Sequence, residues 1–110
     1  MTYCFRDCEI QEADFSNWDF SNITSLDNLF YSISATPLKK VNFTNFNAPK
    51  CTRFDYMFLN NSNLEEVIIP EGFGRGVENF SSMFKGCKAL PLEQINKMDT
   101  SSGTNFSYMF

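Results

Sequence analysis

The chain has 110 residues, four cysteines, no histidine and a formal net charge of −4. This length corresponds to one domain or part of one. Because the chain is acidic and its Lys and Arg residues are dispersed, nucleic acid is not an expected partner. The lack of histidine excludes Ser-His and Cys-His nucleophile pairs. No run approaches about 18 apolar residues and no signal peptide is recognisable, so we expect no membrane insertion by this segment.

A short apolar phrase recurs five times along the chain. In each copy apolar residues stand at positions i, i+3 and i+4, and the final phenylalanines are 25, 28, 26 and 26 residues apart. Such a period predicts a repeat solenoid, in which each unit buries its apolar face against its neighbours. The five copies are Met1-Cys4-Phe5, Leu26-Leu29-Phe30, Phe54-Met57-Phe58, Phe80-Met83-Phe84 and Phe106-Met109-Phe110.

Each unit is predicted to contain one short strand, a polar turn and then one or two helical turns. Segments 13–16, 41–44 and 67–69 alternate or are apolar in the manner of short strands. The recurring phrase has the spacing of helical turns. In the last unit the strand is degraded, with Glu93 in a column that is otherwise apolar. The chain is therefore read as one repeat domain, 1–110, of about four units of 25–28 residues, at approximately 6–30, 31–58, 59–84 and 85–110.

Stacking of such units would place equivalent strands side by side, parallel and in register. The outward positions of the first three strands hold Glu12, Lys40 and Glu66, and the fourth holds Leu92. The first three alternate in sign, and opposite charges on neighbouring strands are mildly stabilising. This alternation favours the proposed register.

The chain starts and finishes at the same phase of the repeat, with no polar capping unit. Solenoids normally need caps that cover their open edges. Two interpretations follow. We expect the chain to be an excerpt of a longer array, and the alternative is that partner subunits cover its ends.

The four cysteines are interpreted as core residues, with a disulfide or a metal site as the alternatives. Cys4 and Cys51 share columns with apolar residues of other units, whereas Cys8 and Cys87 are three units apart, too far for a disulfide. Without histidine or a second close pair, a tetrahedral zinc site is incomplete, and no cofactor is expected. Segment 72–76, Gly-Phe-Gly-Arg-Gly, is interpreted as a turn because it lacks the Lys-Ser/Thr of a phosphate-binding loop.

The unit resembles the BspA-type leucine-rich repeat, also called the mycoplasma lipoprotein repeat. Segment 14–24, DFSNWDFSNIT, resembles the first half of that repeat, and segment 81–87, SSMFKGC, resembles its second half. The resemblance implies a right-handed solenoid of leucine-rich-repeat type, with short parallel β-strands and helical turns. It also implies a non-enzymatic role and a location at the cell surface or outside the cell, with no catalytic or metal residues.

We therefore expect a protein-binding or adhesion module, not an enzyme, from a bacterial surface protein. Its expected partner is another protein, such as a host extracellular protein or a neighbouring subunit. The alternative is a structural or assembly component, of virion or filament type, that uses the open ends of the solenoid. The candidate contact face is the outward side of the strands, where an apolar Ile68 stands among polar residues. This face comprises Glu12, Asp14, Ser16, Lys40, Asn42, Thr44, Glu66 and Ile68.

Overall fold

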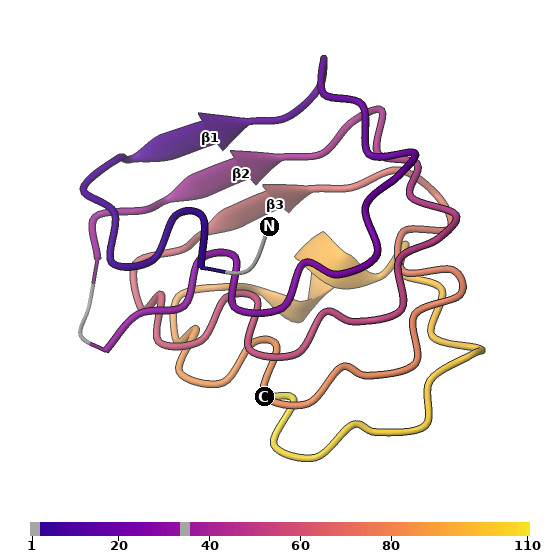
Figure 1. Cartoon of the computed structure of the whole chain (residues 1–110). Helices are drawn as coiled ribbons and strands as arrows, with labels where there is room; N and C mark the ends of the chain where they lie inside the picture. The colour runs from indigo at the N-terminus through magenta and orange to yellow at the C-terminus, as the bar shows by residue number, and fades with distance from the viewer. Residues whose placement is uncertain (1–2, 34–35) are drawn as a thin grey trace.

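Three short parallel strands form one open sheet in a compact chain that has almost no helix. The computed structural model describes residues 3–33 and 36–110. Strands β1 (Glu12–Asp14), β2 (Lys40–Asn42) and β3 (Glu66–Ile68) lie side by side in chain order (Figure 1). Within the described residues the one helical element is a 3₁₀ helix, η1 (Leu92–Ile95). None of these residues belongs to a helix with the length and apolar character needed to cross a bilayer.

The strands are parallel and in the register that the sequence predicted. Glu12 pairs with Lys40, and Lys40 pairs with Glu66, whose carboxylate Oε2 lies 3.7 Å from Lys40 Nζ. The middle residue of each strand faces the core and is buried. In the fourth unit, where the sequence predicted a degraded strand, the chain forms η1, and Leu92 is 68% exposed.

The recurring phrases form consecutive tight turns, so the prediction of helical turns is wrong. In segment 26–31 the N–H of Leu29 donates to the carbonyl of Leu26, and the N–H of Tyr31 donates to that of Asn28. Asn28 itself has a φ of 59°, in the left-handed region, which a right-handed helix cannot contain. Met1 of the first phrase lies outside the described residues. The same left-handed conformation recurs at Tyr3, Tyr56, Ser82 and Tyr108.

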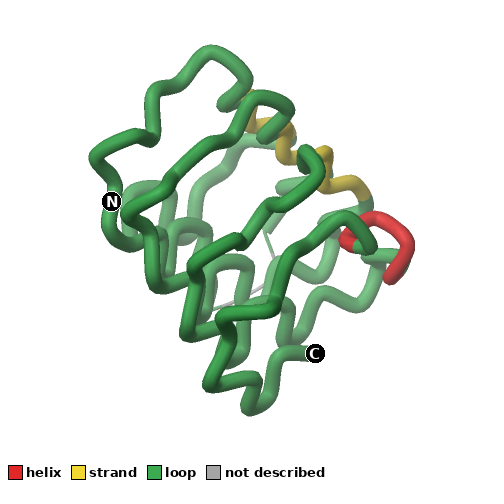
Figure 2. The backbone as a smooth tube through the Cα atoms, turned by 90° about the vertical axis from the view of Figure 1, so that its right-hand side faces the viewer, coloured by secondary structure: helices red, strands yellow, loops and turns green. Residues whose placement is uncertain are grey.

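We call segments 3–7, 25–31, 53–59, 79–85 and 105–110 the turn segments. Backbone hydrogen bonds join each turn segment to the next one along the chain. The N–H of Phe30 donates to Met57 O at 2.8 Å, and the N–H of Phe58 donates to Met83 O at 2.9 Å. Figure 2 shows successive coils of the chain running side by side. Equivalent residues of successive segments therefore lie beside one another, although none of these segments is a strand.

Stacked phenylalanine rings make up much of the core. The ring of Phe30 packs between those of Phe5 and Phe58, with centroid distances of 5.3 and 5.7 Å. The stack continues from Phe58 to Phe84 at 5.5 Å and from Phe84 to Phe110 at 5.9 Å. Burial of one such ring stabilises the fold by about 1.5–3 kcal/mol. The last phenylalanines of the five recurring phrases therefore form one continuous aromatic column.

Candidate binding surfaces

The residues of the predicted contact face do lie together on the sheet. One row contains Glu12, Lys40 and Glu66, and the next row contains the last residue of each strand. None of the eight predicted residues is buried. The second row is Asp14, Asn42 and Ile68, and Ser16 and Thr44 follow two positions after β1 and β2.

Polar side chains at the ends of β1 and β2 accept hydrogen bonds from backbone N–H groups two residues later in the chain. Asp14 Oδ1 accepts the N–H of Ser16 at 2.9 Å, and Asn42 Oδ1 accepts the N–H of Thr44 at 2.9 Å. The bond from Ser16 holds the pKa of the Asp14 carboxyl below its ordinary value. These local bonds fix the turn that follows each strand. Asp14 and Asn42 are therefore structural residues as well as surface residues.

Ile68 is partly buried, because the chain that carries η1 lies beside β3. Between them is a shallow hollow of about 280 Å³ that Glu66, Glu93 and Lys97 also line. The apolar side chain that the sequence analysis singled out thus borders a concave surface with charges of both signs.

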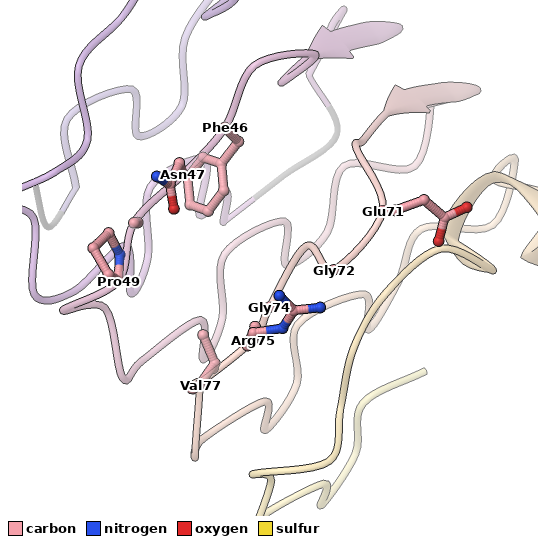
Figure 3. Close-up of a pocket in the computed structure, with 10 residues that line it drawn as sticks. Phe46, Asn47, Pro49, Glu71, Gly72, Gly74, Arg75 and Val77 are labelled. Carbon is pink, nitrogen blue, oxygen red and sulfur yellow. The ribbon is translucent and has the colours of Figure 1, made fainter.

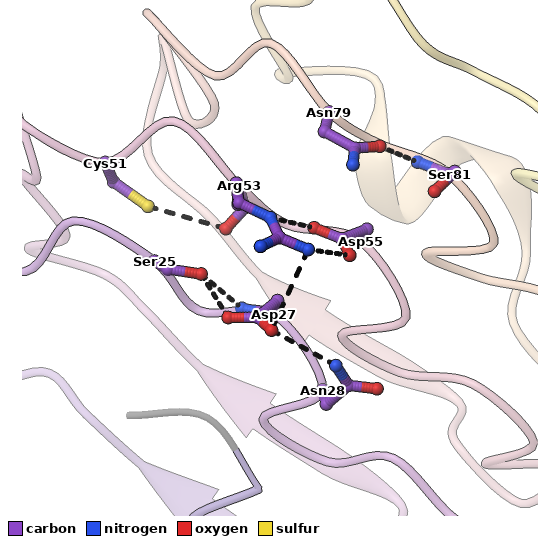
Figure 4. Close-up of polar contacts among 8 residues, drawn as sticks. All are labelled: Ser25, Asp27, Asn28, Cys51, Arg53, Asp55, Asn79 and Ser81. Atoms are coloured by element: carbon purple, nitrogen blue, oxygen red, sulfur yellow. Dashed lines mark hydrogen bonds and ion pairs between the residues drawn. The ribbon is translucent and has the colours of Figure 1, made fainter.

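A second polar site, which the sequence analysis did not predict, lies on the turn segments (Figure 4). Arg53 donates from Nε to Asp55 Oδ1 at 3.0 Å and from Nη2 to Asp55 Oδ2 at 2.7 Å. Its Nη2 also lies 4.0 Å from Asp27 Oδ2. The side chains of Asp55 and Asp27 are only 3% and 11% exposed, whereas that of Arg53 is 51% exposed. The hydrogen bonds to Asp55 raise the pKa of the Arg53 guanidinium further above its ordinary value.

Three tyrosines from successive turn segments surround Arg53. Tyr3, Tyr31 and Tyr56 line a cleft of about 500 Å³ together with Arg6, Asp27, Asn28, Arg53 and Asp55, and we call it the Arg53 cleft. The Arg6 guanidinium carbon lies 5.4 Å from the ring centroid of Tyr3 and 5.3 Å from that of Tyr31. The two rings meet edge to face, with their centroids 5.9 Å apart.

One signal for this cleft was present in the sequence. The third residue of each recurring phrase, which precedes an apolar residue, is a tyrosine in three of the five copies, as the printed sequence shows. All five positions adopt the left-handed conformation, and their tyrosines lie at the surface, with Tyr3 48%, Tyr56 38% and Tyr108 73% exposed, whereas Asn28 and Ser82 are buried. The five residues of this column are Tyr3, Asn28, Tyr56, Ser82 and Tyr108.

The glycine-rich segment 72–76 forms a turn, as predicted, and borders another cleft of about 420 Å³ (Figure 3). Gly72, Gly74 and Gly76 have φ values of 80°, 92° and 82°, which favour glycine. A Cβ on Gly74 would also approach the backbone oxygen of Asp99 to 3.1 Å. Arg75, at the edge of this cleft, donates from Nε to Asp99 Oδ2 at 3.2 Å. Glycine is thus required here by backbone geometry.

All four cysteines are free thiols. Cys51 is buried, as predicted, and Cys8 and Cys87 are partly buried against the core. Cys4 is exposed, so its predicted core position is wrong: it lies in segment 3–7, where Tyr3, Arg6 and Asp7 are exposed as well. Burial raises the pKa of Cys87 to about 12. Within residues 3–33 and 36–110, no three His, Cys, Asp or Glu side chains are grouped as metal ligands.

A family model described as "Mycoplasma protein of unknown function, DUF285" matches residues 1–110. The match covers the strands, the turn segments and both candidate surfaces. No curated protein and no solved structure matches the chain.

Proposed function

The chain belongs to the DUF285 family, and on this premise we propose that it is a non-enzymatic protein-binding module. In this proposal the module acts in adhesion at a bacterial cell surface, and its partner is another protein, such as an extracellular protein of a host. The resemblance of segments 14–24 and 81–87 to the BspA-type repeat supports this role.

The same proposal includes a leucine-rich-repeat solenoid of BspA type as the full description of the fold. Its support is the pairing of equivalent positions along the chain. Ala13, Val41 and Val67 are aligned in the sheet, and Ser25, Arg53 and Asn79 are aligned through isolated parallel bridges between turn segments. In a repeat scaffold of this kind each unit contacts mainly its neighbours.

The observation that carries the proposed function is the separation of core and surface positions within the sheet. The middle residues of the three strands are buried, while the flanking residues form exposed or half-exposed rows. Residues in those rows can differ without any change in core packing. The rows therefore offer a surface whose chemistry can be adapted to a partner, with Lys40, Asn42 and Ile68 at its centre.

The proposal is tested by the binding of the purified chain to immobilised collagen, laminin and fibronectin, measured by surface plasmon resonance. We expect saturable binding to at least one of them. A triple variant, Lys40→Ala, Asn42→Ala and Ile68→Ala, should lose most of that binding. A matched control is Lys50→Ala, because Lys50 is exposed and its Nζ donates to Asn22 outside the sheet. Unchanged binding by the triple variant would exclude the strand face, and no binding to any of the three proteins would contradict the proposed partner class.

A further inference from the structure

We propose that the Arg53 cleft is a binding site for a neutral carbohydrate. This site is separate from the strand face and goes beyond the proposed function, because it takes a different class of ligand. The lining consists of three tyrosines, two arginines, two aspartates and one asparagine. Every one of these side chains ends in a planar group, and all of them can form hydrogen bonds. The volume of about 500 Å³ lies within the range of small-molecule sites.

The charges of the cleft argue for a neutral ligand. Arg53 is held by both oxygens of Asp55 and lies near the carboxylate of Asp27. Arg6 lies 3.3 Å from Asp7, so the second guanidinium is also paired. Because carboxylates balance the guanidinium groups, neither an anion nor a cation gains a strong net attraction in the cleft. The site therefore offers directional hydrogen bonds without a strong net field.

Hydrogen-bonding capacity remains at the centre of the cleft. Asp55 engages the Nε and Nη2 of Arg53, whereas Nη1 has no hydrogen-bond partner within the described part of the chain. Half of the Arg53 side chain is exposed, so this nitrogen can donate to a ligand. The Asp55 carboxylate fixes the plane of the guanidinium in advance, which lowers the entropic cost of binding. Paired N–H donors in one plane suit the neighbouring hydroxyl groups of a sugar ring.

The aromatic walls suit the apolar faces of a sugar. Tyr3 and Tyr31 are held edge to face, with Arg6 near both ring centroids, so their positions are fixed before a ligand arrives. Tyr56 lies on the next turn segment and is 38% exposed. Rings supply contact area at low conformational cost, and the tyrosine hydroxyls can donate and accept hydrogen bonds. Together with Arg53 they surround the ligand with both apolar and polar groups.

Variation within the tyrosine column supplies a matched pair of variants. Tyr56 and Tyr108 have φ values of 58° and 54°, and Asn28 has the same conformation in the same column. Asparagine is therefore compatible with the backbone at both positions. Tyr56→Asn removes a ring from the cleft, whereas Tyr108→Asn removes an equivalent ring that does not line it.

The test is an NMR titration of the ¹⁵N-labelled chain, including the Arg53 Nε–H resonance, with maltose, lactose and N-acetylglucosamine. Glucuronate and a tyrosine-rich neutral peptide are the comparison ligands. We expect saturable shifts at Tyr31, Arg53 and Tyr56 with at least one neutral sugar, at a Kd of about 1 mM. Tyr56→Asn should weaken binding roughly five- to tenfold, the scale of one lost aromatic contact. Tyr108→Asn should bind as the unchanged chain does.

Three results would overturn the proposal. The first is the absence of saturable shifts with all three neutral sugars. The second is stronger binding of glucuronate or of the peptide, which would assign the cleft to another ligand class. The third is equal weakening by Tyr108→Asn and Tyr56→Asn, with both variants retaining the dispersed spectrum of the folded chain. Because the test uses sugars and the purified chain, its result is independent of binding to matrix proteins.

Discussion

The ring of Phe58 lies parallel to that of Phe30, with the two centroids 5.7 Å apart and the ring planes at 7°. On its other side Phe58 stacks on Phe84, and it is fully buried. Phe58→Ala should lower the free energy of unfolding by about 3–5 kcal/mol, because it leaves a cavity within the aromatic column. Urea denaturation followed by circular dichroism measures this change.

Phe110→Ala is the matched control, because Phe110 belongs to the same column but is 64% exposed. We expect it to cost much less than Phe58→Ala. Where Phe58→Ala does not fold, Phe58→Leu should still show a loss of about 1–3 kcal/mol. Equal effects at positions 58 and 110 would mean that burial in the column does not determine stability.

Arg53→Ala should destabilise the chain by about 1–3 kcal/mol, since it leaves the buried Asp55 carboxylate without its bidentate partner. The matched control is Arg75→Ala. Arg75 is 78% exposed and pairs with Asp99, so its removal should cost only about 0–1 kcal/mol. Thermal or urea unfolding of the two variants checks the comparison, and a larger effect at Arg75 would contradict the structural role of the Arg53 pair.

The sequence predicted the sheet correctly because two independent signals coincide there. Apolar residues at the middle of each strand set the buried face, and the alternating charges of Glu12, Lys40 and Glu66 favoured the register that the sheet has. The turn segments were misread because apolar residues at i, i+3 and i+4 share one side of a double turn as well as one side of a helix. The left-handed backbone conformation of residues such as Asn28 and Tyr56 distinguishes the double turn from a helix.

The two candidate surfaces also differ in how far they can be predicted from the sequence. The strand face follows directly from the period, so its residues could be placed in rows from sequence alone. The Arg53 cleft depends on a pairing between Arg53 and Asp55 within one turn and on tyrosines from two preceding turn segments. Positions i and i+2 of a helix do not face each other, so the helical interpretation separated the very residues that the turn brings together.

Acid should destabilise the chain in part through Asp99. Hydrogen bonds from Ser101 and Arg75 lower the pKa of this carboxyl from 3.8 to about 2. A group with a lowered pKa in the folded state contributes stability above its unfolded pKa and loses it as the pH falls through the folded value. Asp99 should therefore contribute fully above pH 3.8, and the contribution should disappear between that value and about pH 2.

Asp99→Asn isolates this effect, because asparagine can keep the local turn. Asn105 Oδ1 accepts the N–H of Ser107 at 3.1 Å, the same bond that Asp99 accepts from Ser101 at 3.0 Å. The urea midpoint of Asp99→Asn should lie below that of the unchanged chain near neutral pH, and the two should converge towards pH 2. A difference that stays constant across this range would show that the charge of Asp99 does not contribute to the acid dependence.

Three of the four thiols, those of Cys4, Cys51 and Cys87, should differ in their reaction with a thiol reagent according to exposure and burial. Cys4 is exposed, whereas burial raises the pKa of Cys51 and raises that of Cys87 to about 12. Cys87 Sγ also donates to the carbonyl of Phe58 at 3.1 Å. Cys4 should be modified first because it is exposed. Because the thiolate is the reactive form, the raised pKa values and the burial of Cys51 and Cys87 should restrict their reaction to the unfolded chain.

Mass spectrometry of the modified chain, with and without urea, measures this order residue by residue. In Cys4→Ser the rapid phase of modification should be lost while the slow phase is unchanged. Fast reaction of Cys87 in the folded chain would show that the segment around it opens readily, and the packing of Cys87 against the core would then not persist in solution.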